Sequence, residues 1–481
     1  MEKLLKTTAS FGSTELALII VAVIKNKYLA IEIGPEGYGM FSILDSFFSL
    51  FLAFSGGWLA APTMKYIAGL RSEKKEDSIQ NVLNFTFSVT FFTSLFFVSV
   101  FFIFSNFFLK NFLSSEIAFI YYALFAASFL GTSLSSIMQS YFQGMLFIKE
   151  TIFRKIALRT FDLVSVIILV LLFGLLGFFI NVLVVALFGL FIFIYKSKAN
   201  RPKIVWPIIK DEIIKKVIAF GGINMFIGIL SLLSMYLQRI LVIKFLDIAS
   251  LGLYRAALTF SGYLGIAGNS SMFFVNSKAN EICNIEDRNK QLNDYLKFVL
   301  FTSILFYVPG ILFTEVAINI LYSKQFLGLS PVLYIFIIAQ FLLSIQLGIQ
   351  AQIIGLERLK LYTIVTTIAY VTIVLIPFFF LKSLNILSLG IASILASFIQ
   401  IVVLGIHLRR EFGIGPSSFS FRLIFISTLL LLGSYLLMNQ HVIWKTLYVF
   451  LNIGIMFIQL PNQDRDSIKQ KVNSLLIKLK S

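Results

Sequence analysis

Apolar runs of about twenty or more residues recur along the whole chain, and short polar segments separate them. Such a run crosses a hydrocarbon core about 30 Å thick as an α-helix, whereas a soluble helix shows polar positions with a period of 3.6 residues. The pattern therefore predicts an all-α polytopic membrane protein. The roughly fourteen predicted transmembrane helices are 7–33, 38–68, 82–108, 117–146, 152–173, 175–195, 217–246, 251–279, 292–321, 331–355, 359–381, 386–408, 419–438 and 442–460.

Two of these helices, 152–173 and 175–195, are separated by almost nothing. Only Gly174 and Gly177 are available to mark a turn, which predicts a tight helical hairpin there.

Successive polar segments alternate between strongly basic and weakly charged. This alternation predicts the orientation of the helices in the membrane. One set carries basic clusters at 71–75, 149–155, 196–216, 288–290, 358–360 and 409–410, and the other set carries little beyond Lys110, Lys324, Lys382 and Lys445. Cytoplasmic loops are the basic ones, so both termini are predicted to be cytoplasmic in a multi-pass protein of the bacterial inner membrane. The net charge of +17 is therefore spread over loops, and no contiguous basic surface predicts binding to nucleic acid.

Composition changes the picture in two respects. Charged residues make up 13% of the chain, about half of the roughly 25% found in soluble proteins. One cysteine and two histidines exclude an internal disulfide and argue against a conventional metal site, so no cofactor is predicted.

The first apolar run contains Glu15 and has no small-residue cleavage site, which predicts a retained helix and not a signal peptide.

The two halves of the chain contain an internal repeat. Aligning Gly39 with Gly252 pairs Gly34 with Asp247, and each half then continues into a long helix and a charged loop. Glycine or aspartate is expected there because the helices reverse direction within a few residues. Both copies begin on the same side, and a parallel repeat with a site between its halves is a common transporter design. The alternative is that any short membrane hairpin looks like this.

The stretch Ile33–Leu44 (IGPEGYGMFSIL) resembles the polysaccharide or O-antigen flippases, whose superfamily also includes multidrug-extrusion proteins and lipid II flippases. The resemblance implies two pseudo-symmetric six-helix lobes in a V around a central cavity, plus two C-terminal helices. The substrate it implies is an oligosaccharide linked to undecaprenyl pyrophosphate, used for O-antigen, capsule or exopolysaccharide. Alternating access would move it from the cytoplasmic to the outer leaflet, coupled to a gradient of H⁺ or Na⁺. Membrane lipids and a glycan polymerase or glycosyltransferase are the implied partners.

The predicted organisation follows from these observations. It comprises an N-terminal lobe (1–200), a cytoplasmic basic linker (201–216), a C-terminal lobe (217–410), two further helices (411–460) and a tail (461–481). The end of the linker and the tail both show basic amphipathic spacing, which predicts helices lying on the inner membrane face.

Ionisable residues inside the spans are the candidate site, because each costs roughly 2.5–3.5 kcal/mol at a helix centre. Cations suit a pyrophosphate headgroup, and arginine can bind phosphate oxygens through two parallel hydrogen bonds. The alternative for Lys25, Arg239 and Arg255, which lie toward the outer ends of their helices, is that they extend to the outer interface. The candidate substrate-binding cations are Lys25, Arg239, Arg255, Lys65 and Arg159.

Three carboxylates are candidates for binding a coupling ion: Glu15, Asp45 and Asp162. A buried carboxyl can take up and release a proton during transport. The alternative is a structural pair with a lysine or a hydroxyl. For Asp162 the alternative is a pair with Arg159, one helical turn away on the same helix.

Other functions remain as alternatives at this point. A lipid II or multidrug exporter shares the superfamily, although a mostly cationic site argues against cationic drugs. A membrane glycan polymerase or ligase would need a catalytic loop outside the membrane, but the outer loops are short and His441 is isolated.

Overall fold

The computed structural model describes residues 18–113, 117–196, 201–207, 211–265, 284–356 and 358–459, and no strand occurs in these ranges. A first helix covers 18–32. The further helices are α2 (Gly34–Leu52), α3 (Trp58–Ser72), α4 (Glu76–Ile103), α5 (Ser105–Phe112), α6 (Phe119–Gly144), α7 (Ile148–Lys196), α8 (Glu212–Phe245), α9 (Ile248–Leu264), α11 (Ile285–Leu312), α12 (Thr314–Leu321), α13 (Leu333–Gly355), α14 (Leu359–Leu384), α15 (Leu387–Phe412), α16 (Ser418–Leu437) and α17 (Val442–Gln459), with a π-helical turn at Ala53–Gly57 and a 3₁₀ segment at Lys324–Leu329.

Within these ranges, eleven helices are long and apolar enough to cross a membrane. One of the eleven contains both arms of α7, and the helices at 18–32 and α9 fall below the length required. The described part is therefore consistent with the fourteen predicted spans, and it confirms the all-α membrane class. Large apolar side chains such as Leu171, Phe379 and Leu436 are exposed, as expected for a surface that faces lipid.

The predicted hairpin lies inside α7. Gly174 adopts φ 56° and ψ −134°, outside helical geometry, and divides the element into two arms. Phe161 and Phe188, on opposite arms, stack with ring centroids 3.9 Å apart. A side chain at Gly177 would collide with the carbonyl oxygen of Leu169, so glycine is required where the arms meet.

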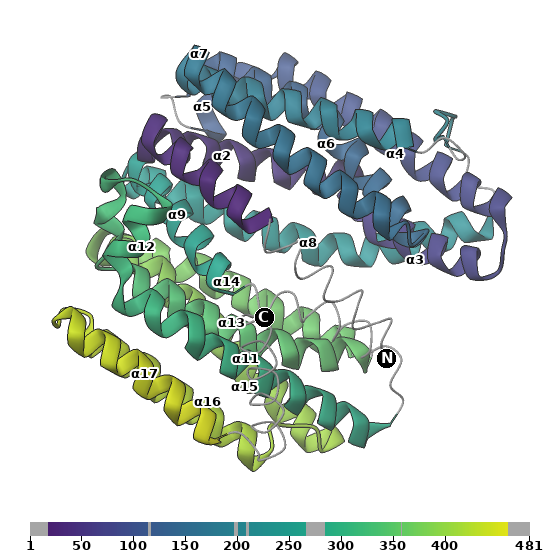
Figure 1. Ribbon diagram of the computed structural model, residues 1–481. Coiled ribbons are helices and arrows are strands. Elements are labelled where there is room, and N and C mark those ends of the chain that lie inside the picture. Colours follow the sequence, from purple (N-terminus) through teal and green to yellow (C-terminus); the bar gives the residue numbers. More distant parts are fainter. Residues whose placement is uncertain are drawn as a thin grey trace, which may run out of the picture. The chain divides into compact units, whose positions relative to one another are not determined.

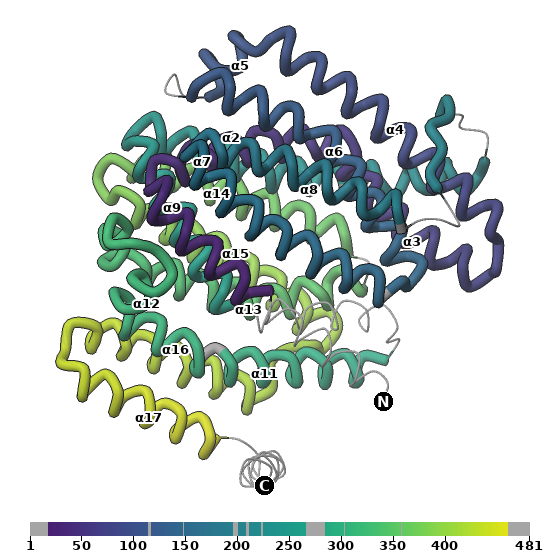
Figure 2. The backbone as a smooth tube through the Cα atoms, turned by 45° about the horizontal axis from the view of Figure 1, so that its top comes forward, coloured from purple at the N-terminus to yellow at the C-terminus, as the bar shows by residue number. Residues whose placement is uncertain are grey.

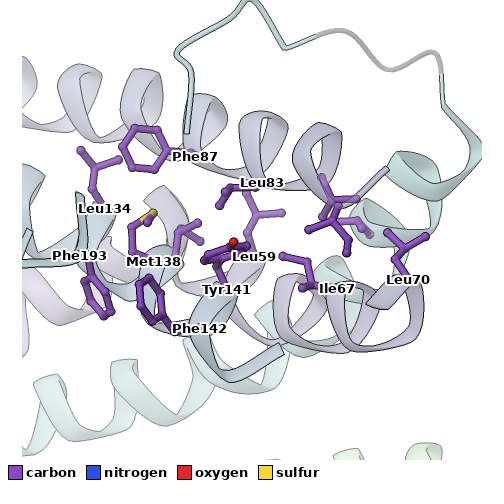
Figure 3. Close-up of a cluster of buried hydrophobic side chains, with 14 residues drawn as sticks. Leu59, Ile67, Leu70, Leu83, Phe87, Leu134, Met138, Tyr141, Phe142 and Phe193 are labelled. Carbon is purple, nitrogen blue, oxygen red and sulfur yellow. The ribbon is translucent and has the colours of Figure 1, made fainter. Parts of the chain in front are cut away.

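The chain divides into two compact units. This division does not test the lobe boundaries expected from the sequence, which stay a prediction. The first unit comprises Met1–Ala256, Asn319–Gly328 and Tyr370–Leu389. In it, α4, α6 and α7 run side by side, and α3 packs on α6 and α8 (Figures 1 and 2). Their shared core gathers Leu83 and Phe87 from α4, Met138 from α6 and Phe193 from α7 (Figure 3).

The second unit comprises Ala257–Ile318, Leu329–Ala369 and Gly390–Ser481. Its helix α11 packs against α13, α16 and α17. Buried glutamines lie within this unit, and Gln350 on α13 donates a hydrogen bond of 2.6 Å to Gln400 on α15.

The structure corrects the prediction for the end of the linker. Helix α8 begins at Glu212, and the Asp211 carboxylate caps it by accepting a hydrogen bond of 3.0 Å from the backbone nitrogen of Ile213. Ile214 and Val217 are buried in the core of the first unit, so this apolar stripe faces protein and does not lie on the membrane surface. The tail 461–481 lies outside the described residues.

Candidate functional site

The candidate site lies in the first unit, where the two copies of the repeat meet. A side chain on Gly39 of α2 would collide with the carbonyl oxygen of Ile248, and one on Gly252 of α9 would collide with that of Pro35. Each glycine thus lies against the residue four positions before the other glycine, so the contact is reciprocal and follows the repeat. These glycines allow two helices to approach closely. The turn predicted between the first two helices lies at Gly34, whose φ is +59°.

The second copy contributes two arginines that meet a carboxylate of the first copy. Asp45 Oδ2 lies 3.1 Å from a terminal nitrogen of Arg255 and 3.9 Å from one of Arg239. The Arg239 guanidinium also donates a hydrogen bond of 2.7 Å to the Ser42 carbonyl. The Arg255 guanidinium lies 4.1 Å from the centre of the Phe41 ring, within the range of a cation–π interaction.

Asp45 and the two arginines differ in how deeply they are buried. The side chain of Arg239 is 7% exposed, that of Arg255 is 21% exposed, and that of Asp45 is 38% exposed. Arg239 therefore does not extend to the interface, as the alternative would require. It stands eight residues before Asp247, about 12 Å along the helix from the turn. Arg255 and Asp45 are the accessible partners.

A second ion pair connects the first helix to the α7 hairpin. The Lys25 ammonium lies 2.7 Å from both carboxylate oxygens of Asp162. Asn181, on the other arm of the hairpin, donates a hydrogen bond of 2.8 Å to Asp162, and Ser165 donates one to Asn181. Asp162 thus contacts Lys25 and Asn181, whereas the predicted partner Arg159 is exposed.

These charges form one electrostatic group. Lys25 interacts with the charges of Arg159 and Arg255, and Arg255 interacts with Arg239. We call this set the intramembrane charge cluster; its members are Lys25, Asp45, Arg159, Asp162, Arg239 and Arg255. Four cations against two carboxylates leave an excess of two positive charges. The cluster can therefore attract an anion, most strongly if that anion displaces a carboxylate.

Two other basic residues lie apart from the cluster. Lys65 is exposed, with its ammonium 4.1 Å from the centre of the Phe220 ring, and it lies outside the cluster. Arg154, assigned to the cytoplasmic flank, is buried: its guanidinium lies 3.6 Å from the centre of the Phe193 ring and donates a hydrogen bond of 3.0 Å to Gln139. Arg154 thus joins the core of the first unit.

Two polar side chains beside Asp162 are not among the predicted site residues. Asn181 and Ser165 were missed, although each is a polar residue within an apolar run, which is the available signal. Glu15 lies outside the described residues. Within the described ranges, no three His, Cys, Asp or Glu side chains converge as metal ligands.

Comparison with known proteins identifies a family for the sequence and similar solved structures for the fold. Residues 33–331 match the family model described as polysaccharide biosynthesis protein. No curated protein sequence matches the chain.

Several of the solved structures that resemble the chain are named as transporters or flippases. The lipid II flippase MurJ in an inward closed conformation gives a TM-score of 0.75 at 17% identity and covers 96% of this chain and 100% of its own. An inward-facing MATE family multidrug transporter of the MOP superfamily gives 0.69 at 13% identity, covering 82% and 95%. A MOP superfamily transporter from Pyrococcus furiosus gives 0.58 at 14% identity, covering 84% and 94%. At these identities the likeness shows a shared fold.

Proposed function

We propose that this chain, which belongs to the family of polysaccharide biosynthesis proteins, is a flippase for an oligosaccharide linked to undecaprenyl pyrophosphate. The match over 33–331 confirms the resemblance indicated by Ile33–Leu44. The proposed direction is from the cytoplasmic to the outer leaflet of a bacterial inner membrane, by alternating access. Glycan polymerases or glycosyltransferases are the proposed partners. A transporter fold over nearly the whole chain gives no support to the polymerase or ligase alternative.

The intramembrane charge cluster is the observation that carries this proposal. Its excess of two positive charges suits a pyrophosphate, and charged groups inside a membrane are costly unless they pair or serve transport. A cationic drug would be repelled by the same excess. The family and the charge together favour an anionic lipid-linked substrate.

Arg255 is the proposed contact for the pyrophosphate. Its guanidinium is held by Asp45, an exposed carboxylate, so a pyrophosphate can compete with that carboxylate for the same hydrogen-bond donors. Arg239 is held by the Ser42 carbonyl and is more deeply buried, and we assign it the role of keeping Asp45 and Arg255 in place.

Glycan display in cells carrying variants of Arg255 tests the proposal. Arg255→Ala should abolish display at normal protein abundance, and Arg255→Lys should restore it only partly because lysine lacks the planar pair of donors. Arg255→Gln should fail as Arg255→Ala does. The control is Arg422→Gln, an exposed arginine of the second unit, which should display normally. Near-normal display by Arg255→Gln at normal abundance contradicts the assignment.

Asp45 is the proposed coupling residue among the described carboxylates, because it is more exposed than Asp162 and contacts two arginines. Binding of the coupling ion at Asp45 would weaken its attraction for Arg255 and leave that cation to the substrate. Flipping in vesicles with an imposed gradient of H⁺ or of Na⁺ identifies the ion. Asp45→Asn should then flip substrate at a rate that no longer responds to that gradient. An unchanged response would assign coupling to another residue.

Lipid II is a second candidate substrate, because the lipid II flippase matches this chain almost end to end. It also carries a pyrophosphate, so the cluster does not separate the two. Rescue of a cell depleted of its own lipid II flippase would favour lipid II, whereas loss of surface glycan without a cell-wall defect in a deletion strain would favour the oligosaccharide.

A further inference from the structure

The segment 201–207 lies along α4 and is held there by a row of polar side chains. Gln80, Asn84 and Ser88 are spaced four residues apart and so share one helix face. Gln80 donates to a carbonyl of the segment at 2.9 Å, Asn84 accepts from a backbone nitrogen at 2.8 Å, and Ser88 accepts from another at 2.9 Å. The backbone of 201–205 is therefore fastened to α4 inside the first unit.

A pocket of about 270 Å³ lies between this segment and the helices behind it. Its walls are apolar side chains of α4, α6 and α7, among them Phe87 and Leu134, which lie next to each other in Figure 3. Pro202 and Ile204 close it on the side of the segment, and Arg201 is the charged member of its lining. The lining of the pocket is thus apolar apart from the cation Arg201.

The residues around the opening are typical of a membrane interface. Trp206 is 77% exposed and its ring centre lies 5.6 Å from that of Phe92. Ile204 is exposed as well, and so are the cations Arg201 and Lys203. Exposed tryptophan beside arginine and lysine marks the level of lipid headgroups. The basic loops predict that this is the cytoplasmic leaflet, where lipids with anionic headgroups attract cations.

We propose that the pocket binds one acyl chain of an anionic phospholipid, whose phosphate group is held by Arg201 and Lys203. An apolar cavity alone would accept the chain of any lipid. Arg201 in its lining and the exposed Lys203 two positions further along the segment select a headgroup with net negative charge, because a zwitterionic headgroup offsets its own phosphate. The bound lipid also covers the apolar face of 201–207 and keeps the segment on α4.

Lipid binding to the purified full-length protein in detergent tests this site. The probes are palmitoyl-oleoyl phosphatidylglycerol and palmitoyl-oleoyl phosphatidylcholine, which share their acyl chains, and native mass spectrometry counts the bound molecules. We expect phosphatidylglycerol to bind more tightly. Arg201→Gln should weaken its binding about five-fold while leaving phosphatidylcholine unchanged. Ile204→Trp, which fills the pocket from an exposed position, should weaken both lipids.

The matched control is Arg410→Gln, an exposed arginine outside the pocket, which should change neither affinity. Each variant is first shown to melt at the wild-type temperature without added lipid. Equal affinity for the two lipids, or an equal loss in Arg201→Gln and Arg410→Gln, would mean general surface attraction and overturn the site. Unchanged binding to Ile204→Trp would place the acyl chain elsewhere. Displacement of phosphatidylglycerol by undecaprenyl phosphate at lower concentration, or by inorganic phosphate, would assign the pocket to a different ligand.

Discussion

At the scale of single residues, Asp162 is the most constrained charge in the cluster. Both of its oxygens lie 2.7 Å from the Lys25 ammonium, and its side chain is 9% exposed. Removing one partner of a buried pair leaves an uncompensated charge, at a cost of roughly 3–5 kcal/mol. Asp162→Asn should therefore lower the melting temperature and abundance of the purified protein, as measured by thermal unfolding in detergent.

The double variant Lys25→Met/Asp162→Leu separates structure from transport. Replacing both charges by apolar groups of similar size should recover part of the lost stability, since Asn181 then loses its acceptor at Asp162. If Lys25 also binds the substrate, this folded double variant should still fail to display glycan. Full display would reduce the Lys25–Asp162 pair to a structural role.

The sequence identifies the members of the cluster better than their partners. A charge inside an apolar run stands out by its cost, so Asp45, Asp162, Arg239 and Arg255 were all found. Lys25 and Asp162 are 137 positions apart, and no local spacing links them. The neighbour Arg159 was chosen because helical periodicity shows only contacts within one helix.

At the scale of the helical elements, the contact of α2 with α9 depends on two glycines. A methyl group at Gly39 or Gly252 would collide with a carbonyl of the other helix. Backbone cannot move aside as a flexible side chain can, so overpacking should cost roughly 1–3 kcal/mol at each site. Gly39→Ala and Gly252→Ala should each lower the melting temperature and reduce glycan display.

Gly69→Ala is the matched control, because nothing lies within 4 Å of a side chain added there in α3. It should melt at or above the wild-type temperature, since alanine favours a helix over glycine. Normal melting and display by both Gly39→Ala and Gly252→Ala would show that the repeat contact is not required.

The positions of the helices follow from hydropathy, and the hairpin at Gly174 follows from the glycine between two apolar runs. The apolar stripe that ends in Val217 was misread for a physical reason. A helix whose stripe faces protein and a helix lying on a membrane have the same spacing of apolar residues. The burial of Ile214 and Val217 decides between them, and the spacing of apolar residues in the sequence does not reveal burial.

At the scale of the whole molecule, the lengths of the apolar runs predict the membrane class. The contact between the two repeat copies in the first unit, such as that of Gly39 with Ile248, does not follow from those lengths. In a sequence, small residues are the only sign that two backbones approach closely. The repeat alignment pairs Gly39 with Gly252, but the alignment alone does not show that the two residues lie against each other's helix. The orientation in the membrane stays a prediction that rests on charge.

Cysteine labelling tests that orientation at two exposed turns. In a Cys283→Ser background, Ser383→Cys is placed at the end of α14 and Lys75→Cys before α4, and both positions are exposed. The basic cluster at 71–75 predicts a cytoplasmic turn for Lys75, and the opposite side for Ser383. A membrane-impermeant maleimide applied to intact spheroplasts should label Ser383→Cys and leave Lys75→Cys unlabelled. After permeabilisation both should react, which shows that each cysteine is reachable. Labelling of Lys75→Cys in intact spheroplasts, with Ser383→Cys protected, would invert the topology. That result would also place the proposed lipid pocket in the outer leaflet.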